Sequence, residues 1–393
     1  MRRTLSAIVS IRTLSIWGAL SLAACNQPVG PLAQTSPVTT VPVSSTTTAR
    51  NLYAATGVNA LSPEARMARP LVYVPNSKGG SVSIIDPQEY KVIRTVQTGK
   101  VPQHVVPSRD MTVLWVTNNE GDTLTPIDPR TGQEGAPVKV ADPYNLYFTP
   151  DGRYAMVIAE ALRRVDFRDP KTMKFVQSLS VTCRGLDHVD FTADGKTAIA
   201  SCEFSGELVK FDMEKLSVVG YLKLPPHGPD HPMPQDVRIS PDGAVVYVAD
   251  MHADGVHIVN VDAFSYAGFI ETGRGAHGFV VDRGGARLFV ANRGWHMTTT
   301  ARHGPGTVSV IDFDTRKVVA TWPVPGGGSP DMGNVTADGK ELWLGGRYDN
   351  EVYVFDTETG QLTHRIPVGR EPHGLCVWPQ PGVYSLGHTG NMR

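Results

Sequence analysis

The chain has 393 residues, with 37 Lys and Arg against 38 Asp and Glu, so its net charge is −1. This balance excludes a protein that binds nucleic acid through bulk positive charge. Hydrophobic residues make up 41% of the chain and charged residues 19%, a composition that supports a folded core. The 39 glycines and 30 prolines exceed the usual combined share of about 12%. They predict many short strands and tight turns rather than long helices.

The chain begins with a pattern typical of export. Arg2 and Arg3 precede an apolar stretch that ends in Leu-Ala-Ala-Cys at Cys25. The segment resembles a bacterial lipoprotein signal, which implies cleavage before Cys25 and a lipid on its thiol. An ordinary signal peptide with a chance cysteine is the alternative, and the apolar run is too short for a membrane-spanning helix.

Three regions follow from this pattern: a signal peptide (1–24), the lipidated cysteine with a tether (25–69) and a folded domain (70–393). The first part of the tether is rich in Pro, Ser and Thr and almost uncharged, so it cannot bury enough surface to order itself. Asn26 after the cysteine suggests, by the same resemblance, sorting to the outer membrane or cell surface. We therefore expect an exported, lipid-anchored protein of the periplasm or cell surface, with the outer membrane favoured.

From about residue 70 the chain repeats a pattern of two apolar strands, the second of which ends in Asp. The copies are spaced by 38 to 50 residues, the length of one four-stranded propeller blade. They end at Asp86, Asp128, Asp166, Asp212, Asp262, Asp312 and Asp356. This predicts an all-β fold, a seven-bladed β-propeller; a β-solenoid, the alternative, would have shorter repeats.

The first strand of each copy carries a family resemblance. LWVTN (114–118) and VYVAD (246–250) are two examples, and Asp-Gly turns such as Asp242-Gly243 stand in front of several of these strands, where they supply the positive φ of a tight hairpin. The chain resembles the YVTN-type β-propellers, which include YncE-like and quinoprotein amine dehydrogenase-like proteins. They are related in fold to the haem d propeller of cytochrome cd-type nitrite reductase. The resemblance specifies a fold and not an activity.

The two ends of the repeat predict how the ring closes. The first complete inner strand begins near His104 and the last near His373, whereas the strands in 71–98 have no inner strand of their own. We expect the last inner strand to complete that blade and remove the open edge. The segment 382–387 (GVYSLG) competes with 71–76 for the second place in this composite blade.

Inner strands line a propeller's channel, so their first residues should form a ring at one mouth. Counting four places back from the Ser or Thr of each turn, or its equivalent, gives His104, Asn145, His188, Asp236, His277, Met332 and His373. Imidazole, carboxylate and thioether groups are ligands for a transition metal, with copper favoured. A small anion bound by protonated imidazoles and a repeat that merely copied a structural histidine are the alternatives.

More histidines map to loops on the same face. They are His227, His231, His252, His296, His303 and, less clearly, His388. Cys183 and Cys202 also map there, and in an oxidising compartment we expect a disulfide, with metal ligation or free thiols as alternatives. Cys376 is expected in the core.

Several functions remain open. The first is a binding module whose histidine-rich face holds a metal, a small ligand or a partner protein. The second is a redox or cofactor-handling protein, implied by likeness to nitrous-oxide reductase and the haem d propeller. It would use copper or a noncovalent haem with His104 or His277 as axial ligand. A copper site of the nitrous-oxide reductase type would have histidine from all seven blades, whereas three ring positions here are Asn, Asp and Met. A lactonase-like hydrolase is the third. The sequence contains no C-x-x-C-H motif for covalent haem.

Overall fold

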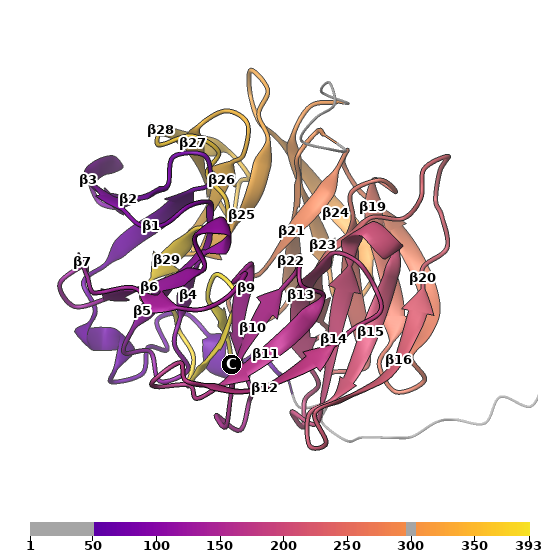
Figure 1. The fold of residues 1–393 in the computed structure, drawn as a ribbon. Helices are drawn as coiled ribbons and strands as arrows, with labels where there is room; N and C mark the ends of the chain where they lie inside the picture. Colours follow the sequence, from indigo (N-terminus) through magenta and orange to yellow (C-terminus); the bar gives the residue numbers. More distant parts are fainter. Residues whose placement is uncertain (1–50, 296–303) are drawn as a thin grey trace, which may run out of the picture. The chain divides into compact units, whose positions relative to one another are not determined.

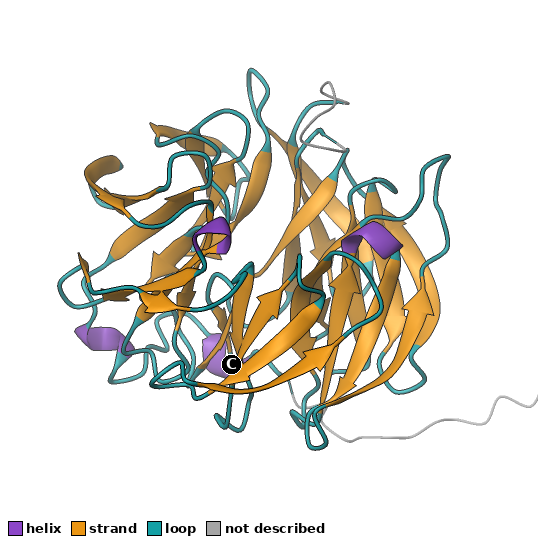
Figure 2. Ribbon diagram, viewed as in Figure 1, coloured by secondary structure: helices purple, strands orange, loops and turns teal. Residues whose placement is uncertain are grey.

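The repeated segments form the predicted strands. The computed structural model describes residues 51–295 and 304–393, which lie in a compact unit from Ala49 to Arg393. In these two ranges the strands form seven antiparallel sheets, the blades of a β-propeller, and helix is limited to four short 3-10 turns (Figure 2). The predicted signal peptide, Cys25, His296 and His303 lie outside the described residues.

Each blade is described from its inner strand outward. Blade 1 is β29 (Cys376–Trp378), β1 (Leu71–Asn76), β2 (Ser81–Asp86) and β3 (Lys91–Gln97). Blade 2 is β4 (Pro102–Pro107), β5 (Leu114–Asn118), β6 (Thr123–Asp128) and β7 (Gln133–Glu134), with β8 (Val138–Lys139) also on β6. Blade 3 is β9 (Asn145–Phe148), β10 (Ala155–Ala159), β11 (Arg164–Arg168) and β12 (Phe175–Ser180). Blade 4 is β13 (Leu186–Phe191), β14 (Thr197–Cys202), β15 (Glu207–Asp212) and β16 (Ser217–Lys223).

The remaining blades continue the order. Blade 5 is β17 (Pro234–Ile239), β18 (Val245–Asp250), β19 (Gly255–Asn260) and β20 (Ser265–Glu271). Blade 6 is β21 (Ala276–Val281), β22 (Arg287–Asn292), β23 (Thr307–Asp312) and β24 (Lys317–Pro323). Blade 7 is β25 (Pro330–Val335), β26 (Glu341–Gly346), β27 (Glu351–Asp356) and β28 (Leu362–Pro367). The short turns are η1 (Ala54–Thr56), η2 (Ala65–Met67), η3 (Asn119–Gly121) and η4 (Glu203–Ser205).

The repeated aspartates and the burial pattern explain the blade. Asp86, Asp212 and Asp356 each accept a hydrogen bond from a main-chain N–H of the turn that follows, which sets the hairpin to the outer strand. The second strands are buried on both faces, whereas an outer strand such as β3 alternates exposed and covered residues. The core therefore lies between blades, and polar residues at the inner strands are buried with it.

The ring closes through blade 1. β29 pairs with β1, with Leu71 opposite Trp378 and Tyr73 opposite Cys376, and inner strands of neighbouring blades contact one another around the ring. The segment 382–387 is not a second strand of this blade. It contributes β30 (Ser385–Gly387), which pairs with the inner edge of β9 and is followed by β31 (Asn391–Met392). Figure 1 shows this C-terminal segment, in yellow, beside β4 and β9.

The start of the described chain corrects the predicted domain boundary at residue 70. Tyr53 and Ala65 are buried, and Tyr53 donates a hydrogen bond to the carbonyl of Ile239. Leu61 forms a bridge with Gly382. Residues 51–69, which composition alone assigned to the tether, therefore pack on the propeller through a few apolar anchors. Within the described ranges, no helix has the length and apolarity needed to cross a membrane.

Candidate metal centre in the channel

Two tiers of side chains occur where the inner strands begin. In blade 2 the pair Pro102↔Asn118 is followed by a register shift before Val105↔Val116, and blades 4, 5, 6 and 7 have a shift at the same place. The two residues that follow the first pair of the inner strand define a mouth tier and an inner tier; in blades 1 and 3 the two residues are placed by position. The mouth tier is Gln103, Tyr144, Asp187, Gln235, His277, Asp331 and His373, and the inner tier is His104, Asn145, His188, Asp236, Gly278, Met332 and Gly374.

The sequence count put His277 and His373 at the level of His104, and this is wrong by one residue. In blade 6 the turn residue is Asp282, whose carboxylate accepts hydrogen bonds from the N–H groups of Ala286 and Arg287. Four places before it is Gly278. Blade 1 has no such turn after its inner strand, so the count there had no reference point. The two histidines therefore belong to the mouth tier.

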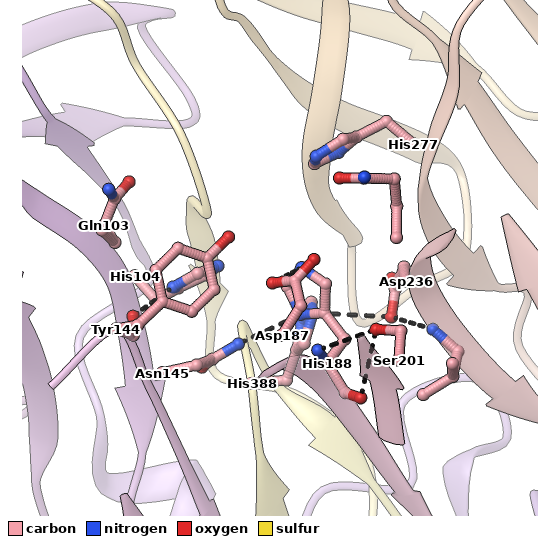
Figure 3. A network of polar contacts seen from close by, with 12 residues as sticks. Gln103, His104, Tyr144, Asn145, Asp187, His188, Ser201, Asp236, His277 and His388 are labelled. Atoms are coloured by element: carbon pink, nitrogen blue, oxygen red, sulfur yellow. Dashed lines mark hydrogen bonds and ion pairs between the residues drawn. The ribbon is translucent and has the colours of Figure 1, made fainter. Parts of the chain in front are cut away.

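The four ring histidines nevertheless lie together. The centroids of the His104 and His373 rings are 4.8 Å apart, and those of His188 and His277 are 6.4 Å apart. Figure 3 shows His277 and Gln103 above His104, Asn145 and Asp236 in this view. Imidazoles from blades 1, 2, 4 and 6 thus meet in the channel.

An inner triad is made by His104, His188 and His388. One nitrogen of each lies within 4.8 Å of the others, and all three side chains are buried. Within the described ranges, the Nε2 atoms of all three lack a hydrogen-bond partner. Two carboxylates lie near: Asp187 Oδ1 is 3.2 Å from His188 Nε2 outside hydrogen-bonding geometry, and Asp236 Oδ1 is 3.6 Å from His388 Nε2.

The other ring nitrogens of the inner triad are held by the protein. His104 Nδ1 lies 3.0 Å from the carbonyl oxygen of Tyr144. Because a carbonyl only accepts, Nδ1 carries the proton and Nε2 has the lone pair. His388 Nδ1 is 3.0 Å from Thr389 Oγ1, and His188 Nδ1 is 3.2 Å from Tyr147 Oη. His104 has the arrangement in which a second shell orients a metal-binding imidazole. His188 Nδ1 also lies 3.1 Å from the Asn145 amide nitrogen, a donor, so metal binding at His188 Nε2 requires the ring proton to move from Nε2 to Nδ1.

The mouth tier contains a second cluster of His277, Asp331 and His373. His277 Nδ1 is 2.8 Å and His373 Nε2 is 3.6 Å from the Asp331 carboxylate. Arg293 donates to Asp331 Oδ1 from Nε at 3.0 Å and from Nη2 at 2.8 Å. Although burial opposes ionisation, Arg293 and the two histidines hold the pKa of Asp331 well below its usual value. The guanidinium already balances this carboxylate, so the mouth cluster needs no added cation.

Burial keeps the channel imidazoles neutral. It lowers the pKa of His104 to about 3 and that of His277 to about 4. The pKa values of His188, His373 and His388 are also lowered well below the ordinary value by burial. Protonated imidazoles holding an anion, one of the sequence-based alternatives, are therefore disfavoured at neutral pH.

The other predicted ring residues have structural partners. Asn145 Nδ2 lies 3.1 Å from His188 Nδ1. Asp236 accepts hydrogen bonds from the N–H groups of Val237 and Phe279, and burial raises its pKa to about 6. The Met332 side chain is buried beside Gly278.

The loop histidines lie apart from the inner triad. His227 stacks on Phe269, its ring centroid 3.8 Å away, and His252 Nδ1 is 2.8 Å from the carbonyl of His231. Of the accessory residues within the described ranges, His388 is the one that the structure brings into the inner triad. The sequence placed His388 on this face less clearly than the other histidines, because residue 388 directly follows the segment 382–387, interpreted as a blade strand.

The cysteines take the expected places. Cys183 and Cys202 form a disulfide with a Cα separation of 6.0 Å. Cys376 is a free cysteine, buried in β29. Neither sulfur of the disulfide is available to bind a metal.

Fold and channel together define a β-propeller with a histidine-lined axis. The profile of the YncE-like β-propellers matches residues 47–381, and the chain belongs to this family. No curated protein sequence matches the chain.

Solved structures show the same fold. Hydrazine synthase from Kuenenia stuttgartiensis aligns with a TM-score of 0.60 and 20% identity over 82% of this chain and 99% of that chain. A functionally unknown protein from Desulfotomaculum acetoxidans aligns with 0.65 and 14% over 79% of this chain and 100% of that chain. The dihydro-heme d1 dehydrogenase NirN, in complex with DHE, aligns with 0.59 and 14% over 82% of this chain and 78% of that chain. At these identities the likeness concerns the fold.

Proposed function

We propose that this protein is an exported β-propeller that binds one transition-metal ion in its channel through His104, His188 and His388. The observation that carries the proposal is the meeting of three buried imidazoles, one nitrogen of each within 4.8 Å of the others, whose Nε2 atoms lack hydrogen-bond partners within the described ranges. A buried polar atom without a partner is costly. A metal ion satisfies all three at once.

The three imidazole donors limit which metal ions the site would bind. Three imidazoles suit Zn²⁺, Cu²⁺, Fe²⁺ or Ni²⁺, and they leave further coordination positions open. Asp187 lies beside His188, and burial followed by repulsion from Glu203 and Glu160 raises its pKa well above the usual value. A cation at the inner triad would stabilise the ionised form of this carboxyl. The arrangement therefore favours a divalent ion of the imidazole-binding group.

Metal titration tests the proposal. The purified chain is stripped with a chelator and titrated with Zn²⁺ and with Cu²⁺ by calorimetry, and the metal content of the untreated protein is measured. We expect one ion per chain and loss of this site in a His104→Ala/His388→Ala variant. A His364→Ala control on β28, outside the channel, should bind as the wild type does. Unchanged metal content in the double variant would overturn the proposal.

A mouth-tier variant separates the two clusters. Because Arg293 balances Asp331, a His277→Ala/His373→Ala protein should keep its metal. Loss of metal only in this variant would move the site to the mouth cluster.

Export and anchoring belong to the same proposal and rest on the Leu-Ala-Ala-Cys motif at Cys25. A Cys25→Ser variant should leave the membrane fraction for the soluble periplasmic fraction. Retention in the membrane fraction would remove the lipid anchor from the proposal.

A tetrapyrrole-handling role is the second candidate. It is favoured by two arginines, Arg293 and Arg347, beside His277 and His373 in one cavity, and by the likeness to NirN, whose structure holds DHE. Histidine is an axial ligand for haem, and guanidinium groups pair with carboxylates. A Soret band in the purified protein, or a shift of the Soret band of added haem, supports this role; added haem whose spectrum stays that of free haem removes it.

A further inference from the structure

A cavity of about 310 Å³ lies at the mouth tier, and its lining includes His277 and His373. This is within the range of small-molecule sites. Those two rings lie next to the inner triad. The charged residues of the cavity come from a third ring, none of whose members is a ligand in the proposed metal site.

The third ring consists of the seven residues that directly follow the second strand of each blade. In order from blade 1 to blade 7 it consists of Ser77, Asn119, Glu160, Glu203, Met251, Arg293 and Arg347. The two acids stand on adjacent blades 3 and 4, and the two arginines on adjacent blades 6 and 7. In a closed ring of seven, blades 3 and 6, like blades 4 and 7, are three positions apart. The acids and the arginines therefore face each other across the cavity.

The Arg347 guanidinium is held but not neutralised. It is 9% exposed, and its Nη1 donates to Ser77 Oγ at 3.1 Å. Ser77 Oγ in turn donates to Gln103 Oε1 at 3.2 Å. Within residues 51–295 and 304–393, Nε has no hydrogen-bond partner, and no carboxylate forms an ion pair with Arg347. Arg293, in contrast, holds Asp331.

A buried unpaired charge is costly, and a planar guanidinium fork suits a carboxylate. Arg347 lines the cavity and therefore offers it a guanidinium that no carboxylate of the described residues pairs with.

The opposite wall favours a hydrogen-bond donor or a cation. Burial and the nearby Glu203 raise the pKa of Glu160 to about 7, and burial raises the pKa of Glu203. Two carboxyls that are partly buried and close together are relieved by an amine between them.

We propose that this cavity binds a small molecule that carries a carboxylate at one end and an amine at the other. The carboxylate pairs with Arg347, and the amine contacts Glu160 and Glu203. The proposal stands on the cavity walls and does not require the metal site.

Calorimetry on the chelator-treated full chain tests the proposal separately from metal binding. The probes are glycine, β-alanine and γ-aminobutyrate, which vary the spacing of the two ends, with acetate and ethylamine as single-ended controls. We expect at least one of the three zwitterions to bind at least tenfold more tightly than either control. The absence of binding by all three, or acetate binding as tightly as the best of them, would overturn the proposal.

Variants assign the two ends. Arg347→Gln should weaken the best zwitterion at least tenfold, and Glu203→Gln should also weaken it, whereas Arg370→Gln, a change of an exposed arginine, should not. Arg347→Lys keeps the positive charge without the planar guanidinium and should give an intermediate loss of affinity. If circular dichroism shows that the Gln variant does not fold, the Lys variant takes its place. Wild-type affinity in the Arg347 variant would overturn the proposal, even if metal binding is intact.

Discussion

Replacing Arg393 by Met should loosen the segment that carries His388. The guanidinium of Arg393 is buried, with Nη2 2.7 Å from Asp190 Oδ1 and Nη1 2.8 Å from the carbonyl of Phe191. It also lies over the Tyr53 ring, 5.9 Å from the centroid. One side chain thus ties the C-terminal segment to blade 4 and to the N-terminal segment.

The size of the effect follows from the ion pair. Asp190 is completely buried, so the variant leaves an unpaired charge, at a cost of about 3–5 kcal/mol. For a unit of this length the unfolding entropy is about 0.7 kcal/mol/K, so the midpoint should fall by about 4–7 °C. Because His388 lies between β30 and β31, in the segment that Arg393 anchors, the affinity for the metal should also fall, by at least tenfold.

Scanning calorimetry and metal titration measure both effects. A combined Asp190→Asn/Arg393→Met protein is the matched control, because it removes the unpaired charge and should recover part of the stability. A midpoint within 1 °C of the wild type, together with unchanged metal affinity, would refute the assigned role of Arg393.

Two further changes test other parts of the structure. Gly374→Ala should reduce metal affinity at least tenfold, as measured by Zn²⁺ titration, because its Cβ would overlap the ring of His104; Gly220→Ala, with open space around it, is the control and should bind normally. A Cys183→Ser/Cys202→Ser protein should lose about 3 kcal/mol of stability, given a sequence separation of 19 residues. Denaturant unfolding of the variant and of the wild type, with and without reductant, measures the difference in stability. A difference seen only without reductant assigns the lost stability to the disulfide.

The fold was accessible from the sequence because each blade repeats the same local chemistry. The aspartates at the ends of the third strands cap the next turn, and this requirement recurs wherever a blade does. The closure of the ring was predictable as well. The strands in 71–98 lack an inner strand and the last inner strand lacks outer strands, so pairing them completes one blade and leaves no open edge.

The site was only partly accessible. His104 and His188 follow from the repeat, because inner strands in the same phase place them in one tier. His388 does not, since it comes from a hairpin outside the repeat that pairs with β9. The mouth tier was misjudged at His277 and His373 because blade 6 turns at Asp282 in place of a Ser or Thr and blade 1 has no such turn, so the count lacked its reference residue. Arg347 and Glu203 had a readable signal, their common place after the second strand, but charges at loop starts are usually solvated.

The broken symmetry of the channel explains how a repeat could hold the single ion that we propose. A ring of seven equivalent side chains surrounds an axis, whereas a metal needs three nitrogens about 2 Å from one point, on one side. Gly278 and Gly374 leave the inner tier without side chains on blades 6 and 1. On the other side the C-terminal hairpin lies against β9 and brings His388 to within ring contact of His188, with centroids 4.7 Å apart. In the proposed site the repeat therefore supplies two ligands, and the C-terminal hairpin outside the repeat supplies the third.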